Sequence, residues 1–281
     1  MLVFLQGKFV SEEEAVVSVF DRGYRYGDSL FEAVLVRHGK MFRWKQHLER
    51  LQRSAEFLKI QIPYSADELR AFAEELIARN GLVDCAVRLQ LSRGRGPRGY
   101  APSGEEKPFV VMSFHPVPVR ELLNETKWKL TVSSFRVAAN DALANHKTCS
   151  RLLQVCAAME AHERGADESL IVNTNGEITE GSTSNVFWIE HGTVCTPPLA
   201  VGILPGVTRA AILELCDQLS IPRTERNAQP EQLKQMDGVF LTFTTRGVVE
   251  AESLDGRPLA RSTLTKRLQE ALQKLVEREC S

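Results

Sequence analysis

Three short segments carry residue types that could do chemistry together. Lys147, in the polar segment ANHKT, precedes a helical pattern, and Glu180, in ITEGSTSN, precedes an apolar strand. Residues 202–209, GILPGVTR, form a glycine-bounded turn that opens a helix. An amine can bond to a carbonyl, a carboxylate can keep a ring nitrogen protonated, and free N–H groups at a helix start can take a phosphate. A protein needs these three groups to hold and tune pyridoxal phosphate.

In this order the segments resemble those of the class IV (fold type IV) pyridoxal-phosphate enzymes, from about Met1 to about Leu259. That family includes branched-chain aminotransferases, D-amino acid aminotransferases and aminodeoxychorismate lyases. The resemblance implies that Lys147 is the catalytic lysine, bonded to the cofactor as a Schiff base. It also implies that Glu180 faces the pyridine nitrogen. Such a lysine must be partly desolvated to lose its proton near neutral pH.

The resemblance implies further cofactor contacts. One is an arginine on a helix whose planar fork would clamp the phosphate. Others are the first residues of the helix after the GILPG turn, a leucine beneath the cofactor ring and a threonine hydroxyl that reaches the phosphate. In this sequence they are Arg50, Leu204, Gly206, Val207, Thr208 and Thr244.

The segment LSRGRGPRGY at residues 91–100 contains a GxGxxG string. A dinucleotide fingerprint must open a helix, and Pro97 followed by YAPSG does not, so we interpret the string as part of a basic, glycine-rich loop. In the resembled family this loop reaches a substrate carboxylate. The candidate substrate-binding residues are Arg98, Tyr100, Phe31, Arg88 and Thr245.

Single positions distinguish the branches of the family. Tyr100 follows the lyase form of the loop, where D-amino acid aminotransferases carry a histidine. Phe31 replaces the tyrosine that binds a carboxylate in those aminotransferases, and Leu35 stands where branched-chain aminotransferases carry an arginine. Lys147 is followed by an Arg-Leu pair four and five residues on, as in the lyases.

The leading hypothesis is therefore an aminodeoxychorismate lyase, which forms 4-aminobenzoate and pyruvate for folate synthesis. An aminotransferase acting on branched-chain, D- or other amino acids with a 2-oxo acid acceptor is the alternative. A non-catalytic binding protein on the same scaffold is the remote one.

The surrounding pattern alternates strands and helices, which indicates an α/β (α+β) protein. The stretch HPVPV at residues 115–119 cannot be helical and reads as a connector, so we place a small domain at 1–115, a linker at 116–121 and a large cofactor-binding domain at 122–281. Expected strands are 2–5, 8–10, 33–37, 41–42, 86–91, 109–114, 129–133, 169–172, 185–189 and 239–242; expected helices are 42–59, 67–80, 150–164, 206–219 and one from about 262.

Composition excludes several other classes. The chain has 281 residues, 43% of them hydrophobic, and a net charge of −1, so no broad attraction to nucleic acid or to an anionic membrane is expected. Six scattered cysteines show no metal-ligand spacing, which indicates reduced thiols in a cytoplasmic protein without a metal site. No signal peptide or membrane span is expected. The resemblance further implies a pseudo-barrel sheet in the large domain, a cofactor between the domains and a homodimer.

Overall fold

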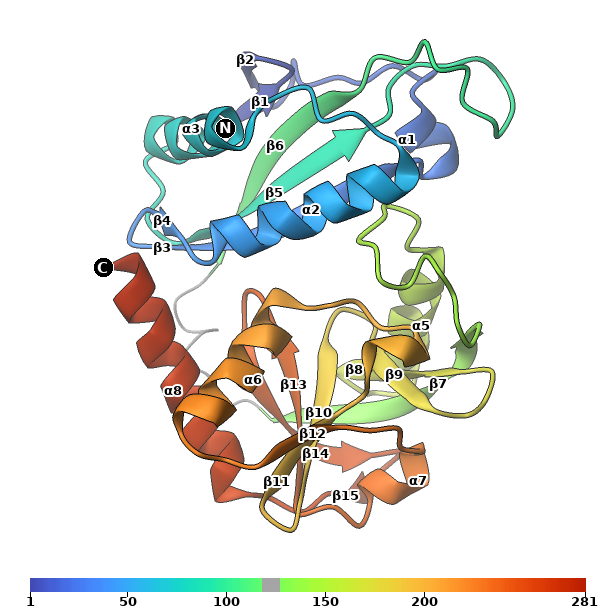
Figure 1. The fold of residues 1–281 in the computed structure, drawn as a ribbon, viewed down its shortest axis with the longest axis vertical. Helices are drawn as coiled ribbons and strands as arrows, with labels where there is room; N and C mark the ends of the chain where they lie inside the picture. Colours follow the sequence, from blue (N-terminus) through green and yellow to red (C-terminus); the bar gives the residue numbers. More distant parts are fainter. Residues whose placement is uncertain (118–126) are drawn as a thin grey trace. The chain divides into compact units, whose positions relative to one another are not determined.

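The structure is a computed structural model that describes residues 1–117 and 127–281 (Figure 1). It divides into two compact units. The predicted linker at 116–121 falls largely outside the described residues, so the predicted boundary stays a prediction. The division also groups Lys147 with the N-terminal unit, although the sequence placed it in the C-terminal domain. The first unit contains Met1–Val119, His146–Ser150 and Val276–Ser281, and the second contains Arg120–Asn145 and Arg151–Leu275.

The first unit is built on an antiparallel sheet of six strands in the order β2-β1-β6-β5-β3-β4. Two helices, α2 and α3, bury their apolar stripes in the same cluster as the strands. A capping box of Ser65 and Glu68 fixes the start of α3. The elements are β1 Leu2–Leu5, β2 Lys8–Ser11, α1 Arg22–Tyr26, β3 Ser29–Arg37, β4 Lys40–Met41, α2 Trp44–Leu58, α3 Ala66–Arg79, β5 Cys85–Ser92 and β6 Phe109–Pro116.

The second unit is built on a mixed sheet of nine strands, whose main path is β12-β11-β10-β13-β14-β7-β8-β9, with β15 paired to β14. The pairs β11–β12, β14–β7 and β7–β8 are parallel. The strands are β7 Trp128–Val137, β8 Glu168–Asn173, β9 Ile178–Gly181, β10 Asn185–Glu190, β11 Thr193–Thr196, β12 Arg223–Glu225, β13 Gly238–Phe243, β14 Gly247–Leu254 and β15 Arg257–Pro258. The helices are α5 Leu152–Glu163, η1 Leu199–Val201, α6 Val207–Gln218, α7 Pro230–Leu233 and α8 Thr263–Cys280. Within residues 1–117 and 127–281, no helix has the length and apolarity to cross a bilayer.

Three differences from the expected elements bear on the site, and one is that Glu180 lies within strand β9, which was not expected. Strand β3 begins at Ser29 and not at residue 33, because its pairing with β5 continues as far as Ser29 and Ser92. Strand β14, which was not expected, follows the turn after β13. A register shift between Ala251 and Ser253 breaks its alternation, so its period was not visible in the sequence.

Candidate functional site

Lys147 is held by backbone pairing to the start of β3. The carbonyl of Lys147 accepts a hydrogen bond from the amide of Phe31 at 2.9 Å, and the amide of Cys149 donates to the carbonyl of Ser29 at 2.9 Å. An isolated antiparallel bridge joins Leu30 to Thr148 between them. Residues 147–149 therefore pair alongside the start of β3 through this isolated bridge, which fixes Lys147 on the first unit.

The alternation of side chains along β3 separates two sets of polar residues. Leu30 and Val34 belong to the buried cluster formed with α2 and α3, so Glu32 shares their face of the sheet. Phe31 points to the opposite face. The same holds on β5 for Arg88, which lies opposite Ala33 in the register.

On that second face the structure brings together three predicted site residues. The Nζ atom of Lys147 lies 4.4 Å from the ring centroid of Phe31, and the guanidinium carbon of Arg88 lies 3.9 Å from it. Attraction of a cation to an aromatic face holds both groups at the ring. Lys147, Phe31 and Arg88 are all half-buried. An amine and a fixed guanidinium around one ring could engage the amine-bearing carbon and a carboxylate of one small molecule.

On the helix-covered face, Arg50 is fixed by an acidic partner that sequence analysis missed. Its Nε and Nη2 atoms donate to the two oxygens of Glu32 at 2.8 and 2.6 Å, and both side chains are at least 96% buried. The ring of His47, one helical turn before Arg50, lies 2.7 Å from the same carboxylate. The sequence offered two signals of this cluster. One was Glu32 within an apolar strand, and the other was His47 and Arg50 three residues apart on one helix.

The charges of this cluster decide its protonation. Burial acts to raise the pKa of Glu32, but the charge and hydrogen bonds of Arg50 and the hydrogen bond of His47 outweigh it and lower the pKa to about 2. Burial lowers the pKa of His47, and the opposing effect of Glu32 does not fully offset it. Near neutral pH Glu32 is therefore ionised and His47 neutral, so Nδ1 of His47 donates to the carboxylate.

In the second unit the structure brings together Glu180, Asn185, Leu204 and Gly206. The Glu180 carboxylate accepts from the amide of Leu204 at 2.9 Å and from the side-chain amide of Asn185 at 3.2 Å. Asn185 also donates to the carbonyl of Leu204 at 3.0 Å. A Cβ atom at Gly206 would collide with the Asn185 amide oxygen, so a larger residue there would displace the Asn185 side chain. Glu180 and the GILPG turn are thus one hydrogen-bonded unit.

Gly206 is the N-cap of α6, and no side chain caps that end. The first intrahelical bond runs from the amide of Ala210 to the carbonyl of Gly206, so the helix itself leaves the amides of Val207 and Thr208 unused. Thr208 is 7% exposed. A helix start with unused donors and a buried hydroxyl suits an anion such as phosphate.

Sequence analysis also missed Glu168, which organises the loop between Glu180 and Asn185. Its carboxylate accepts from the backbone amides and hydroxyls of Ser182 and Thr183 and from the hydroxyl of Ser184. A buried carboxylate with this many donors is satisfied and rigid. Its position at the start of a buried strand, before SLIVN, was the only sequence signal.

The remaining predicted residues lie on turns. Thr244 and Thr245 are half-buried in the turn that joins β13 to β14. Arg98 and Tyr100 are exposed on the long loop between β5 and β6, and the Tyr100 ring packs edge-on against Tyr26 at 5.5 Å.

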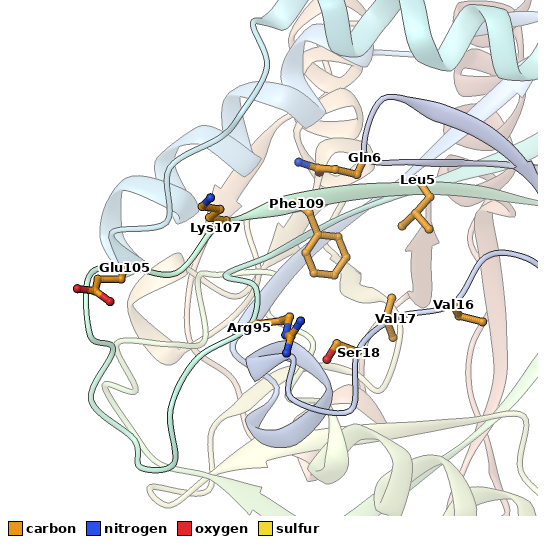
Figure 2. Close-up of a pocket in the computed structure, with 9 residues that line it drawn as sticks. All are labelled: Leu5, Gln6, Val16, Val17, Ser18, Arg95, Glu105, Lys107 and Phe109. Atoms are coloured by element: carbon orange, nitrogen blue, oxygen red, sulfur yellow. The ribbon is translucent and has the colours of Figure 1, made fainter.

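A cavity of about 480 Å³ in the first unit is not the predicted site (Figure 2). None of the predicted cofactor or substrate residues lines it. Its lining consists of Leu5, Gln6, Val16, Val17, Ser18, Arg95, Glu105, Lys107 and Phe109.

The chain is similar to several known proteins over nearly its whole length. The D-alanine aminotransferase of Bacillus licheniformis is 31% identical over 278 residues, which cover 97% of this chain and 96% of that protein. The solved branched-chain amino acid aminotransferase of Escherichia coli has a TM-score of 0.93 at 28% identity and covers 100% of this chain and 96% of its own. A Legionella pneumophila structure provisionally named a 4-amino-4-deoxychorismate lyase has a TM-score of 0.87 at 26% identity, covering 94% and 98%.

The predicted fold, two α/β lobes of fold type IV, is confirmed by these structures. The family model described as Amino-transferase class IV matches residues 29–254, which include β3, the lysine segment and the whole of the GILPG turn. The chain therefore belongs to the class IV aminotransferases, a family of enzymes that depend on pyridoxal phosphate.

Proposed function

We propose that Lys147 binds pyridoxal phosphate covalently, that Glu180 pairs with its ring nitrogen and that Thr208 and the start of α6 take its phosphate. The residues fit the group. Glu180 is fixed by two donors, Asn185 and the Leu204 amide, so its charge is oriented. The unused amides and the Thr208 hydroxyl at the α6 start suit a phosphate dianion. Leu204, Gly206, Val207 and Thr244 complete the proposed set.

Arg50 completes the phosphate contacts in this proposal. Glu32 takes the Nε and Nη2 edge of the guanidinium and fixes its orientation, so the predicted fork-like clamp is not available on that edge and the proposed phosphate contact falls to Nη1. A preorganised guanidinium loses little entropy on binding a phosphate.

In this proposal Lys147, Glu180 and Arg88 each have a separate role in the reaction. Bound pyridoxal phosphate supplies an electron sink that stabilises negative charge on the substrate. Lys147, displaced by the substrate amine, is the base that removes the proton from the amine-bearing carbon. Glu180 keeps the ring nitrogen protonated. Arg88, fixed beside Lys147 on the Phe31 ring, binds a substrate carboxylate.

We propose aminodeoxychorismate as the substrate, cleaved to 4-aminobenzoate and pyruvate. The observation that supports this choice is that strand β5 and the loop after it carry two arginines that could bind carboxylates. Arg88 on β5 contacts the same Phe31 ring as Lys147, and Arg98 lies on the loop that follows β5. The substrate has two carboxylates, and two arginines could receive them. Phe31 has no hydroxyl to bind the single carboxylate of an amino acid.

An aminotransferase is the second candidate, because two of the three relatives described above are named as aminotransferases, one for D-alanine and one for branched-chain amino acids. The same Lys147 and Glu180 would act in it. The two reactions would differ in what Lys147 does with the proton it has taken, and transamination would also need a 2-oxo acid acceptor.

One experiment separates the two candidates. The purified holoenzyme is mixed with aminodeoxychorismate in the absence of any 2-oxo acid, and 4-aminobenzoate and pyruvate are measured. We expect both products in equal amounts over many turnovers. We also expect that single L- or D-amino acids leave the visible absorbance of the bound cofactor unchanged. Bleaching by an amino acid, reversed by 2-oxoglutarate or pyruvate, would establish the aminotransferase instead.

We further propose that the protein is a homodimer, and helix α5 supports this. Leu152, Val155 and Met159 are 73, 50 and 58% exposed, and their spacing of three and four residues places them on one face. Ala157 and Ala161 are buried on the opposite face. A helix that is apolar on both faces is typical of one covered by a partner.

We expect sedimentation equilibrium at micromolar concentration to give twice the chain mass of 31.5 kDa. Met159→Glu should shift the equilibrium toward monomer, because it places a charge in the apolar face. Glu163→Gln, an exposed polar change at the end of the same helix, is the matched control. A parent protein of 31.5 kDa with full activity would contradict the dimer.

A further inference from the structure

Arg22 is a buried charge outside the cofactor and substrate residues discussed above. It is the first residue of α1, and its side chain is 2% exposed. A buried guanidinium is costly unless it is paired and hydrogen-bonded. Its Nε atom donates to Asp28 at 2.8 Å, Nη1 donates to the carbonyl of Gly99 at 3.0 Å, and Nη2 donates to the carbonyl of Tyr100.

Arg22 donates to main-chain oxygens because Asp28, its carboxylate partner, is shared between two arginines. Asp28 is shared with Arg93, whose Nε donates to the same carboxylate oxygen at 2.7 Å. Burial acts to raise the pKa of Asp28, but the bonds and charges of the two arginines lower it, so the group is ionised. One carboxylate cannot neutralise two guanidiniums. Arg93 directs its other donors to the carbonyls of Leu58 and Lys59, and Arg22 directs its own to the 99–100 backbone.

Tyr26 supplies a second link between α1 and the same loop. Its hydroxyl accepts the Gly99 amide at 3.2 Å, and its ring packs edge-on against Tyr100. The Arg22 guanidinium lies 5.2 Å from the Tyr26 ring, a cation–π distance. Both main-chain polar groups of Gly99 are therefore bound to α1, although the Arg98 and Tyr100 side chains on either side are exposed.

Two glycines of the loop stand where a side chain would collide with Arg22 or with the returning chain. A Cβ atom at Gly96 would lie 2.8 Å from the Cδ of Arg22 and 2.9 Å from a Glu106 oxygen. Gly94 has a φ of +98°, and a Cβ there would collide with the carbonyl of Lys107. The GxGxxG string thus leaves room for a buried arginine and for the returning chain. These packing contacts account for two of the three glycines without a role in dinucleotide binding.

We propose that Arg22 is a positioning residue that sets the conformation of the Gly99–Tyr100 backbone and so determines where Arg98 and Tyr100 meet the substrate carboxylate. The hydrogen bonds from Arg22 to the carbonyls of Gly99 and Tyr100 support its effect on the loop backbone. Its effect on substrate binding rests on the proposed function of the loop. Arg22 contacts the loop through main-chain oxygens, so it acts on specificity through its neighbours and not on the substrate itself.

The test compares Arg22→Met and Arg22→Lys with Arg95→Met, an exposed arginine on the same loop. We measure hydrogen exchange of peptides that cover residues 94–106 in the holoenzyme, and then kcat and KM. Loss of two charge-assisted bonds should speed exchange of the loop amides and raise KM by roughly 10-fold to 100-fold, with kcat within about twofold of the parent. Arg95→Met should change neither. KM is measured with whichever amine substrate the parent turns over, so failure of the lyase proposal does not remove the readout.

Three results would overturn the proposal. The first is unchanged loop exchange in Arg22→Met, and the second is faster exchange with KM unchanged. The third is an equal rise of KM in Arg95→Met, which would mean that loop charge and not backbone position matters. If Arg22→Met does not fold, Arg22→Lys carries the test, because its ammonium can still pair with Asp28 but cannot reach both carbonyls in a fixed fork.

Discussion

Replacement of Lys147 by alanine should reduce kcat by roughly two to four orders of magnitude, the usual contribution of a positioned general base. The expected loss is at the upper end, because the same amine would also bond to the cofactor. The backbone pairing of Lys147 with β3 involves no side-chain atom, so the variant should keep its fold and melt within a few degrees of the parent. The measurement is kcat at saturating cofactor and substrate, with thermal melting as the fold control.

A covalent readout identifies the lysine independently of activity. Borohydride reduction of the holoenzyme followed by peptide mapping should leave the pyridoxyl group on Lys147. Lys129→Ala, at an exposed lysine on β7, should retain full labelling at Lys147 and parental turnover. Label on another lysine in the parent protein would refute the assignment.

The site residues that sequence analysis predicted stand in short motifs that can be read without knowing their partners. Lys147 and Glu180 are polar positions in short motifs, and the Gly206 turn precedes its own helix. The α/β class followed from the alternation of elements, and fold type IV followed from the resemblance of these motifs to the family. No contact between distant segments had to be known.

The residues it missed depend on partners far along the chain. Glu32 pairs with Arg50, 18 positions on, and Arg22 reaches the Gly99 backbone, 77 positions on. Glu32 is a charge among apolar neighbours, and Arg22 stands in the polar segment DRGYRYGD, so periodicity marks neither as a buried charge with a distant partner. The late predicted start of β3 added to the difficulty. With the strand beginning at residue 33, the alternation that sends Phe31 and Glu32 to opposite faces was not available.

The buried pair also changes how the phosphate site should be tested. Removing Arg50 would leave the Glu32 carboxylate buried beside a neutral histidine. Breaking a buried ion pair in this way costs about 3–5 kcal/mol of folding stability. A defect in Arg50→Ala would therefore mix lost cofactor binding with lost stability. Thr208→Val removes a hydroxyl at nearly constant volume and is the cleaner phosphate variant.

Glu180→Gln should lower kcat by roughly 10²-fold to 10³-fold even when the enzyme is saturated with cofactor, an effect like that of removing one preorganised electrostatic group. The substitution keeps an oxygen that can accept from the Leu204 amide and differs chiefly in charge. A neutral amide cannot keep the ring nitrogen protonated, so the electron sink weakens while binding persists. The measurement is kcat under conditions where added cofactor gives no further increase.

Thr208→Val is the matched comparison, because it should lower cofactor affinity and leave kcat at saturating cofactor unchanged. Loss of a hydrogen bond to a charged phosphate costs about 1.5–3 kcal/mol, or roughly 10-fold to 100-fold in cofactor affinity. Excess cofactor should restore its kcat to the parental value, whereas no amount should restore that of Glu180→Gln. If Glu180→Gln turns over like the parent at saturation, the carboxylate only holds the GILPG turn through Leu204 and Asn185. The ring nitrogen would then be protonated without it.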